Sequence, residues 1–361
     1  MGVFKDSDSV YKKQQRTMIV GNLGYIGPVL TRFLNQNRPE TSLIGFDNAY
    51  FHGCFINPFE TTDQMLSVQI YEDVRKVKEE HLKDIDNIIY LAAISNDPMG
   101  NVYEIPTHEI NSIAAIRFAE LAKKNGAKRF VFASSCSVYG AGGDDAKNEN
   151  SKLNPLTAYA KSKIDFENKI KPLAGKDFFI TCLRFATACG ASPRLRLDLV
   201  LNDFVASALL KNQIEILSDG TPWRPLIDVE DMCKAILWAI ERNDTSIDSY
   251  LAINVGFDNW NYRIKDLAYA VKDVLNNTEV MVNASATPDK RSYRVDFSLY
   301  KSLAPNNQAH KSIEKTISEL IENIESSTFR MKDFRNSYLI RLNTLNHLRQ
   351  KNKVDSKLNW V

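Results

Sequence analysis

Long apolar runs, an excess of charge and paired cysteines are all missing from this 361-residue sequence. No apolar run approaches the ~18–20 residues of a membrane-spanning helix, so we expect a soluble protein. The 46 basic and 44 acidic side chains nearly cancel, and a net charge of +2 leaves no strongly basic face for nucleic acid. Membrane proteins and nucleic-acid-binding proteins are therefore not the expected classes.

Metal-binding and disulfide signatures are absent as well. The five cysteines are odd in number and scattered, with no Cys-x-x-Cys pair, which is typical of a reducing compartment. The five histidines show no His-Glu-x-x-His or other ligand spacing. The first 17 residues are polar and contain no apolar core of a signal peptide. We therefore expect a cytoplasmic protein without a metal site.

Short strand-like runs alternate with helix-length stretches in the first half of the chain. Helices are expected at 105–125 and 157–170. The runs between them are apolar, β-branched or aromatic, and cover 17–22, 42–46, 67–71, 87–93, 129–135 and 178–185. Strand, helix and strand repeated in this way predict an α/β fold with a Rossmann-type, doubly wound parallel sheet and right-handed crossovers.

From about residue 190 this alternation gives way to longer polar loops. Helices are expected near 198–211, 229–242 and 262–276, in a smaller lobe built on the end of the sheet. Between about 310 and 350, apolar residues at three- and four-residue spacing predict one amphipathic stretch of helix. The members of this stripe are Met331, Phe334, Tyr338, Leu342, Leu345 and Leu348. We expect the stripe to pack on the chain's own body, with a contact between subunits as the alternative.

A glycine-rich turn, GNLGYIG, follows the first expected strand and opens a helix. Gly21, Gly24 and Gly27 let the backbone turn tightly and approach a pyrophosphate, which the N–H groups of the helix start would bind. Asp47 ends the second strand, where a carboxylate accepts from a ribose hydroxyl and repels the 2′-phosphate of NADP. The pattern favours an NAD site, and the alternative is a plain glycine turn beside a surface aspartate.

A tyrosine and a lysine four residues apart lie early in the helix expected at 157–170. The spacing places Tyr159 and Lys163 on one helix face, whereas Lys161 faces away. A neighbouring ammonium and a positive nicotinamide ring would stabilise the phenolate, which could then take a proton from a sugar hydroxyl. Ser135, at the end of the fifth strand, is placed to hold that oxygen in line. Taken alone, a Tyr-x-x-x-Lys pair is also a common accident on helices.

Seven motifs occur together, in the order GNLGYIG, Asp47-Asn48, YEDVRK, LAA at 91–93, SSCSVYG, YAKSK and WRPLIDVED. In this order and at these intervals the chain resembles the extended short-chain dehydrogenase/reductases, specifically their nucleotide-sugar epimerase/dehydratase branch. The resemblance covers roughly residues 17–300. It implies an NAD-dependent enzyme for a nucleotide-diphosphate hexose, with polysaccharide or glycoside assembly as the natural setting.

Residue roles follow from this resemblance. Ser135, Tyr159 and Lys163 match the catalytic triad, and Tyr159 and Lys163 would also contact the cofactor. The other residues that would bind NAD are Gly21, Gly24, Tyr25, Ile26, Gly27, Asp47, Asn48, Asp73, Val74, Leu91, Ala92, Ala93 and Asn111. Arg224 and Arg291 match the arginines that grip the substrate's diphosphate.

The resemblance also divides the chain and implies an assembly. An NAD-binding domain over 17–185, to which later segments return, would be followed by a mainly substrate-binding lobe over 186–310 and a helical extension over 311–361. Asn202, in the lobe, matches a substrate-loop asparagine near the diphosphate. A homodimer would pair through the helices around 105–125 and 157–173.

Some positions depart from the patterns of the family. Thr187 stands where galactose-type 4-epimerases carry an asparagine, so this substrate-binding candidate implies a different sugar pocket. Cys136 and Ser137 stand where the dehydratases carry Asp-Glu. Cys136 is either a second acid/base, because a perturbed thiol titrates near neutrality, or a small buried residue. Arg194 and Arg196 either contact phosphate or an acidic sugar, or are solvated loop charges.

The missing Asp-Glu pair favours epimerisation over dehydration. The expected reaction oxidises the hexose at C4 and returns the hydride after rotation of the 4-keto sugar, so that NAD is recycled. A 4,6-dehydratase, a keto-sugar reductase or dehydrogenase, and a C3/C5 epimerase are alternatives on the same fold. A non-catalytic NAD-binding sensor is a distant alternative, because fold does not fix function.

Overall fold

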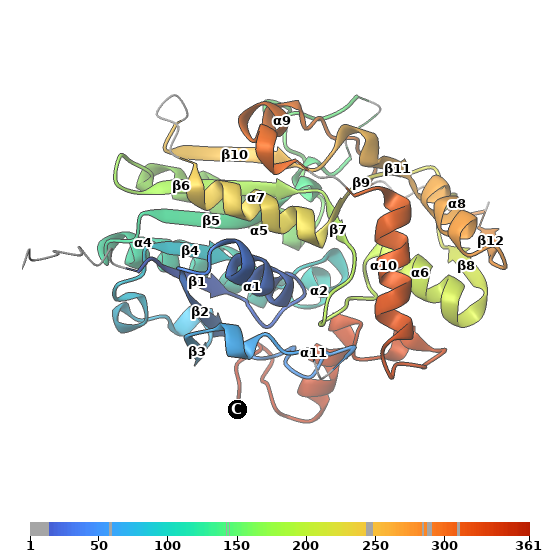
Figure 1. Ribbon diagram of the computed structural model, residues 1–361, viewed down its shortest axis with the longest axis horizontal. Coiled ribbons are helices and arrows are strands. Elements are labelled where there is room, and N and C mark those ends of the chain that lie inside the picture. The colour runs from blue at the N-terminus through green and yellow to red at the C-terminus, as the bar shows by residue number, and fades with distance from the viewer. Residues whose placement is uncertain are drawn as a thin grey trace, which may run out of the picture.

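The computed structural model describes residues 14–57, 60–141, 143, 145–242, 248–283, 285–286, 291–308 and 311–361. A seven-stranded sheet forms the centre of the molecule, and a smaller lobe lies beside one end of its strands (Figure 1). Within the described ranges, no helix combines the length and the apolar character that crossing a membrane requires.

The central sheet is parallel throughout, with the strand order β10-β6-β5-β4-β1-β2-β3. Its strands are β1 (Arg16–Val20), β2 (Ser42–Asp47), β3 (Val68–Tyr71), β4 (Asn87–Tyr90), β5 (Arg129–Ser135), β6 (Phe179–Phe185) and β10 (Tyr250–Val255). The first six confirm the strands predicted from the sequence, and the doubly wound sheet confirms the fold class. The strand β10 was not predicted from the sequence, and it pairs with β6 after the chain has passed through the first segments of the lobe.

Helices cover both faces of the sheet, which explains why its strands read as nearly continuous apolar runs. On one face α1 (Ile26–Asn37) packs beside α7 (Val229–Glu241). The other face carries α4 (Ala115–Lys124) and α5 (Ala158–Ile170), whose Phe118 and Phe166 lie in the core.

The single helix expected at 105–125 is instead a chain of shorter pieces. After α2 (Asp97–Val102), α3 (Glu104–His108) leads through a π-helical stretch, Glu109–Ala114, into α4. The change of helix type lies beside α5, because the π-helical stretch contacts the start of that helix. This irregular stretch matters for the site, since it carries Asn111.

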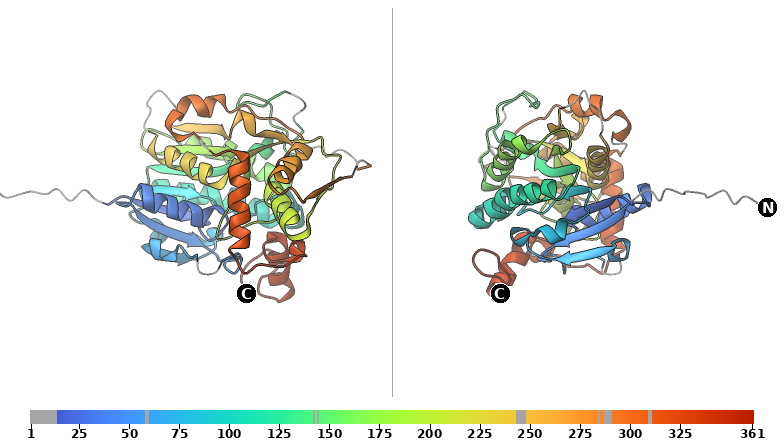
Figure 2. Two further views of the ribbon diagram at one scale, coloured as in Figure 1. Left: turned by 45° about the vertical axis from the view of Figure 1, so that its right-hand side comes forward. Right: turned by 90° about the vertical axis from the view of Figure 1, so that its left-hand side faces the viewer.

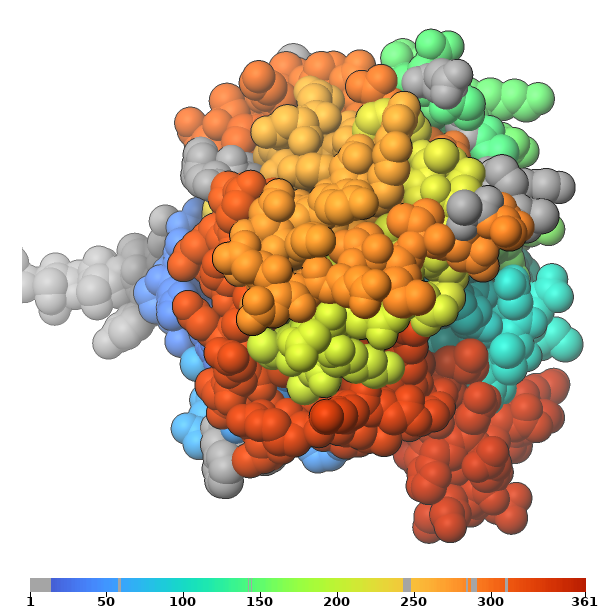
Figure 3. Space-filling view, turned by 90° about the vertical axis from the view of Figure 1, so that its right-hand side faces the viewer, coloured from blue at the N-terminus to red at the C-terminus, as the bar shows by residue number. Residues whose placement is uncertain are grey.

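The smaller lobe has its own core, built around two short sheets. The three-stranded sheet consists of β7 (Thr187–Cys189), β9 (Trp223–Asp228) and β11 (Asn261–Arg263). The two-stranded sheet pairs β8 (Gln213–Ile216) with β12 (Glu279–Val282). The helices α6 (Val200–Lys211), α8 (Ile264–Val274) and α10 (Ile313–Glu325) pack together around these sheets. Figure 3 shows the outer face of the lobe, where the orange α8 region lies beside the yellow-green α6 region.

The prediction of helix throughout 310–350 is wrong, because α10 ends at Glu325 and α11 (Arg341–Gln350) begins only after a looped stretch. Two serines explain the interruption. Ser327 and Ser337 each accept, through the side-chain oxygen, the backbone N–H two residues ahead, which favours a turn over a helix. The stripe is correspondingly divided, since Phe334 and Leu345 are buried while Met331 and Tyr338 are 42% and 45% exposed.

The C-terminal extension packs against the body of its own chain. The helix α10 contacts α6 and α8, and Phe334 belongs to the core of the lobe. Beyond α11, Val354 and Leu358 are buried in the same core cluster as Phe46 of β2. Figure 2 shows the dark red α11 region below the sheet, near the blue early strands. The extension therefore bridges the lobe and the edge of the sheet that carries β2 and β3.

Candidate active site

A cavity of about 650 Å³ lies at the carboxyl ends of β1, β2, β4, β5 and β6, where this edge of the sheet faces the lobe. Ligands of doubly wound folds bind at this edge of the sheet. The glycine loop and Asp47 line one end of the cavity, and Arg224 and Arg291 line the other. Tyr159 and Lys163 also line it. The cavity therefore has two ends of different chemistry.

The glycine loop has the shape that a dinucleotide requires. Gly21 has φ +89°, and a Cβ placed on it would lie 2.5 Å from the backbone nitrogen of Ala92. A Cβ on Gly27 would collide with the carbonyl oxygen of Asn22, so both positions need glycine. Gly24 lines the cavity, so its backbone is free to approach a pyrophosphate at the start of α1. These residues fit the phosphates of a dinucleotide.

Tyr25 ties the glycine loop to the lobe. Its buried hydroxyl donates to the carbonyl of Gly190 at 2.7 Å, and the Ser192 hydroxyl donates to the Tyr25 carbonyl at 2.7 Å. Asn202 is also buried here, because it accepts from the Gly190 N–H at 3.0 Å and donates to the Arg196 carbonyl at 3.0 Å. The side chain of Asn202 thus holds the chain that follows β7, and it does not line the cavity.

Asp47 connects the glycine loop with the end of β2. One carboxylate oxygen accepts from the Leu23 N–H at 3.0 Å, and the other accepts from the Ala49 N–H at 2.7 Å. Burial raises the pKa of the Asp47 carboxyl, and the two N–H donors oppose that rise. Asp47 lines the cavity, and a carboxylate oxygen that accepts one hydrogen bond can accept another from a ribose hydroxyl.

Gly27 packs against Asn22 and does not line the cavity. Of the remaining residues expected to bind NAD, most line the cavity and two do not. Those that line it are Ile26, Asn48, Val74, Leu91, Ala92 and Ala93. The carboxylate of Asp73 instead forms an ion pair with Arg75 at 2.7 Å. Asn111 is fully buried, where it accepts from the Ile94 N–H at 2.9 Å and donates to the Ser162 hydroxyl at 3.0 Å. Asp73 and Asn111 therefore support the cavity wall from behind.

The structure brings Ser135, Tyr159 and Lys163 together at the ends of β5 and the start of α5. Thr157 caps α5 by accepting from the Ala160 N–H, which starts the helix just before Tyr159. The Ser135 hydroxyl lies near the Tyr159 hydroxyl and acts to lower the pKa of the phenol. The Lys163 ammonium donates to the Ala133 carbonyl at 2.8 Å and lies 5.5 Å from the centre of the Tyr159 ring.

Burial within the protein disfavours the charged form of both Tyr159 and Lys163. Burial raises the pKa of Tyr159 to about 12, although the hydrogen bond from Ser135 opposes the rise. Burial lowers the pKa of Lys163 to about 7. A phenolate at neutral pH therefore needs a further positive charge beside Tyr159, and a nicotinamide ring carries such a charge in its oxidised form.

Asp97 is a residue of this site that the sequence analysis did not single out. It opens α2, and its carboxylate accepts from the Thr157 hydroxyl at 2.7 Å and from Arg291 at 2.7 Å. Its charge raises the pKa of Tyr159. The signal was present in the Asn-Asp-Pro sequence after the LAA motif, because Asn96 caps α2 and so places Asp97 in the first turn.

Arginines surround the far end of the cavity. Arg224, on β9, lies 5.8 Å from the centre of the Tyr293 ring, and Thr187 opens β7 at the cavity wall. Of the two alternatives for Arg194 and Arg196, solvated loop charges are excluded, because both side chains are buried. Arg196 lines the cavity and pairs with Asp198 at 2.9 Å. Arg194 lies outside the cavity lining, with its guanidinium 3.8 Å from the centre of the Phe55 ring.

Cys136 is buried behind the cavity. Its thiol donates to the Arg184 carbonyl at 3.0 Å, and burial raises the pKa of the thiol. This geometry favours the small buried residue over the second acid/base. Ser137 does line the cavity, and among the described residues its buried hydroxyl has no hydrogen-bond partner. The same part of the chain holds no group of three or more His, Cys, Asp or Glu side chains that could bind a metal ion.

Comparisons with known proteins agree with this geometry. The family model described as the NAD dependent epimerase/dehydratase family matches residues 17–256. The chain is 28% identical over 236 residues to a Bacillus subtilis protein named uncharacterized UDP-glucose epimerase YtcB, which covers 61% of this chain and 71% of that protein. It is 25% identical over 292 residues to UDP-glucuronic acid decarboxylase 1 of Arabidopsis thaliana, covering 78% of this chain and 63% of that protein.

Solved structures share the fold. One is the structure of the NAD dependent NDP-hexosamine 5,6-dehydratase TunA of tunicamycin biosynthesis, with a TM-score of 0.74 at 20% identity. The match covers 86% of this chain and 98% of that one. The three similar proteins are named for an epimerase, a decarboxylase and a dehydratase, so the likeness by itself leaves the reaction open.

Proposed function

Because the chain belongs to the NAD-dependent epimerase/dehydratase family, we propose that it epimerises a nucleotide-diphosphate hexose through a transient 4-keto sugar. The observation that carries the proposal is the group Ser135, Tyr159 and Lys163 inside the cavity, between a glycine loop and a cluster of arginines. The positions after Ser135 are Cys136 and Ser137, so they supply no carboxylate for an elimination.

Bound NAD supplies the acceptor and the later donor of the hydride, together with the positive charge of its oxidised ring. Tyr159 takes the proton of the sugar 4-hydroxyl and returns it when the keto group is reduced. Ser135 hydrogen-bonds the tyrosine and holds the sugar oxygen in line. Lys163 keeps its ammonium near the phenol ring and stabilises the phenolate.

Arg224 and Arg291 are proposed to bind the diphosphate of the substrate. A guanidinium suits this task because its N–H groups match two phosphate oxygens at once. Arg291 is paired with Asp97 in the protein alone, so the diphosphate would have to replace that carboxylate as its partner. Thr187 lines the neighbouring wall, where it would face the sugar.

A dehydratase is the second candidate, and Asp97 is the observation that favours it. Elimination needs an acid for the leaving hydroxyl and a base for the neighbouring C–H bond. Asp97 provides one carboxylate near Tyr159, and the two positions after Ser135, Cys136 and Ser137, provide none. The absence of a carboxylate at these two positions makes epimerisation the better-supported reaction.

Mass spectrometry of the reaction mixture tests the proposal. UDP-, dTDP-, GDP- and CDP-hexoses are first ranked by the rise in melting temperature, because a ligand of the native state stabilises it. The expected product has the mass of the substrate, with NAD recycled. A product lighter by one water establishes the dehydratase. A product two hydrogens lighter or heavier, with a stoichiometric change in NADH, establishes a dehydrogenase or reductase.

A homodimer is proposed through the helices of residues 97–124 and α5. Three apolar side chains on this surface, Val102, Ile105 and Ile113, are 55%, 63% and 52% exposed. Light scattering after gel filtration should give twice the chain mass, and Ile105→Glu should give one chain mass. Tyr269→Glu is the matched control, because Tyr269 is 48% exposed on α8. A single chain mass for the unmodified protein contradicts the dimer.

A further inference from the structure

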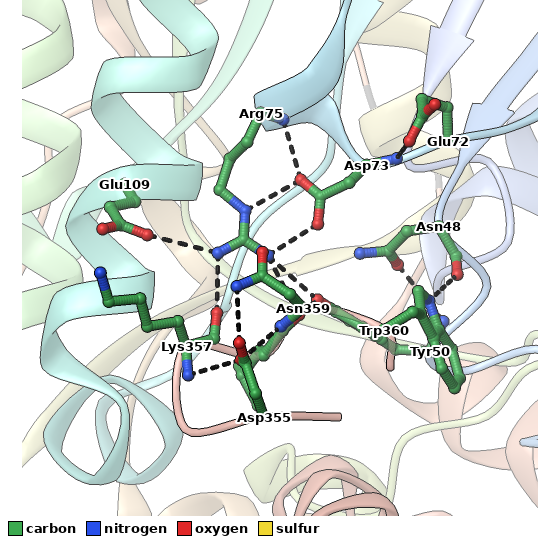
Figure 4. Close-up of polar contacts among 11 residues, drawn as sticks. Asn48, Tyr50, Glu72, Asp73, Arg75, Glu109, Asp355, Lys357, Asn359 and Trp360 are labelled. Atoms are coloured by element: carbon green, nitrogen blue, oxygen red, sulfur yellow. Dashed lines mark hydrogen bonds and ion pairs between the residues drawn. The ribbon is translucent and has the colours of Figure 1, made fainter. Parts of the chain in front are cut away.

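The last residues of the chain lie against the end of the cavity that would hold adenosine. We call residues 354–361 the C-terminal strap (Figure 4). The indole N–H of Trp360 donates to the Asn48 carbonyl at 2.7 Å, and the Trp360 ring lies 5.5 Å from the ring of Tyr50. The Tyr50 hydroxyl in turn donates to the Leu358 carbonyl. Asn48 and Tyr50 both line the cavity, so the strap touches its wall directly.

Arg75 joins the strap to the segment that follows β3. Its guanidinium donates to the carbonyl of Lys357 at 2.7 Å and to that of Leu358 at 3.0 Å. The same guanidinium binds the Asp73 carboxylate at 2.7 Å and Glu109 at 3.3 Å. Figure 4 shows Arg75 between these groups. The side chains of Arg75 and Asp73 are 14% and 6% exposed, so the pair is largely shielded from water.

Contacts within the strap itself also fix its conformation. The Asp355 carboxylate accepts from the backbone N–H groups of Lys357 and Asn359, each at 2.8 Å. Leu358 has φ +58°, a left-handed conformation that a leucine adopts only where its surroundings fix it. Its side chain is fully buried, as is that of Val354, which forms a bridge with Trp360. The turn therefore presents its carbonyls and indole in a set direction.

We propose that the C-terminal strap is part of the dinucleotide site and that Trp360 and Arg75 are positioning residues for its adenosine half. They hold Asn48, Tyr50 and the segment of Asp73 and Val74 in the arrangement that adenosine meets. The strap thereby tightens NAD binding and slows NAD release. The inference rests on the proposed use of NAD, and it concerns only the end of the cavity away from Arg224 and Arg291.

The contacts favour a cofactor role over simple packing for a geometric reason. Packing needs only the buried side chains of Val354 and Leu358, which lie in the core. The indole N–H of Trp360 instead binds the segment that follows β2, and Arg75, which lies in the segment that follows β3, binds the strap carbonyls of Lys357 and Leu358. In this fold those segments surround the adenosine, so their positions bear on the affinity for it.

Binding of NAD and of ADP-ribose by full-length variants tests the proposal. ADP-ribose carries the adenosine and pyrophosphate without nicotinamide. Trp360→Ala should weaken the binding of both by about 3- to 10-fold, the effect of one or two lost contacts, and should speed NAD release by a similar factor. Trp360→Phe keeps a ring against Tyr50, so it should lose only the part of the affinity that comes from the hydrogen bond of the indole N–H. Val361→Ala is the matched control, because Val361 is 90% exposed.

The outcomes separate the strap from the proposed function. Equal affinity of Trp360→Ala and Val361→Ala for NAD and ADP-ribose overturns the strap's role. The role is also overturned if Trp360→Ala lowers the melting temperature of the ligand-free protein and this loss of stability accounts for the whole loss of affinity. Arg75→Lys provides a second test, because lysine keeps the positive charge but lacks the several N–H donors of the guanidinium. This variant should also weaken the binding of NAD and of ADP-ribose. An unmodified protein that binds neither ligand overturns the proposed function itself.

Discussion

Two parts of the cavity are assembled from the chain in different ways. The part around Tyr159, which we call the reaction end, takes Ser135, Tyr159 and Lys163 from β5 and α5, which follow one another closely in the sequence. The adenosine end joins the segments after β2 and β3 to the C-terminal strap, and Trp360 meets Asn48 across 312 residues. The residues of the reaction end are therefore close together in the sequence, whereas those of the adenosine end come together only when the chain folds.

The two ends also differ in how far the protein itself stabilises their charged side chains. Burial raises the pKa of Tyr159 to about 12 and lowers the pKa of Lys163 to about 7, so the reaction end disfavours its own charged forms. At the adenosine end, the hydrogen bonds and charge of Arg75 lower the pKa of Asp73. The Asp73–Arg75 ion pair is complete within the protein, whereas the phenolate of Tyr159 needs the charge of a bound ligand. Residues that serve chemistry at the expense of the isolated fold are typical of active sites.

The largest effect should follow from removing the oxygen of Tyr159 at the reaction end. Tyr159→Phe should keep the fold and NAD binding and lower turnover by ~10²–10⁴-fold, the usual effect of losing a general acid/base. Steady-state kinetics and NAD titration measure the two quantities. Turnover within a few fold of the unmodified protein would assign the proton transfer to another residue.

At the adenosine end, Asp47 should decide which dinucleotide binds. NAD should raise the melting temperature more than NADP, because a carboxylate that faces a 2′-phosphate is repelled at short range. Asp47→Ala should narrow the difference between the two cofactors, with a loss of roughly tenfold in NAD affinity, the value of a hydrogen bond to a charged group. Equal stabilisation of the unmodified protein by NAD and NADP contradicts the role of Asp47.

Lys163→Met should separate function from stability. It should abolish turnover, weaken NAD binding and raise the free energy of unfolding near neutral pH by about 1–3 kcal/mol, the cost of burying a polar group. The folded pKa of about 7 lies below the value of 10.5 for the unfolded chain, so the unfolded state binds more protons between these values. Stability of the unmodified protein should therefore rise with pH across this window, and the variant should lose that part of the slope. Urea unfolding from pH 6 to 9 measures it, and an unchanged slope contradicts the burial penalty.

A smaller effect is expected from the carboxylate of Asp97. Its charge raises the pKa of Tyr159, so Asp97→Asn should move the low-pH limb of kcat/KM toward lower pH, by less than about one pH unit. Asp203→Asn is a suitable control, because Asp203 also lines the cavity and pairs with Arg335. A limb that stays in place or moves toward higher pH would show that Asp97 does not act on Tyr159.

The smallest effect should come from Cys136. Since its thiol points to the Arg184 carbonyl behind the cavity, Cys136→Ala should leave turnover within a few fold. The lost contact should lower the free energy of unfolding by about 1 kcal/mol. A loss of turnover comparable with that of Tyr159→Phe would restore the thiol as an acid/base.

The sequence was informative where a pattern is local. Six strands could be predicted because a sheet covered on both faces requires apolar runs, and the glycine loop because Gly21 needs a positive φ. The seventh strand, β10, lies beyond the stretch in which strands and helices alternate, and it returns to the sheet after the first segments of the lobe. The prediction of one helix for the C-terminal stripe was wrong because Ser327 and Ser337 stabilise turns, and the spacing of apolar residues gives no sign of them.

The site could be predicted to the same extent. Most residues of the expected NAD site line the cavity, but Asn111 of that site and Asn202, the substrate-loop candidate, turn their side chains to backbone groups that the sequence does not reveal. The burial of Arg196 depends on its ion pair with Asp198 two residues away and on Ser95, about a hundred residues earlier. Contacts of this second kind also build the strap, since no local pattern records that Arg75 will meet Leu358.

The buried link between Tyr25 and Gly190 has a thermodynamic consequence for the proposed enzyme. The glycine loop and the chain after β7 cannot shift independently, because Tyr25 both donates to Gly190 and accepts from Ser192. A ligand that orders one segment also orders the other. The second ligand to bind therefore pays a smaller cost in conformational entropy. By reciprocity, a sugar nucleotide should tighten the retention of the dinucleotide by the same factor that the dinucleotide tightens the sugar nucleotide.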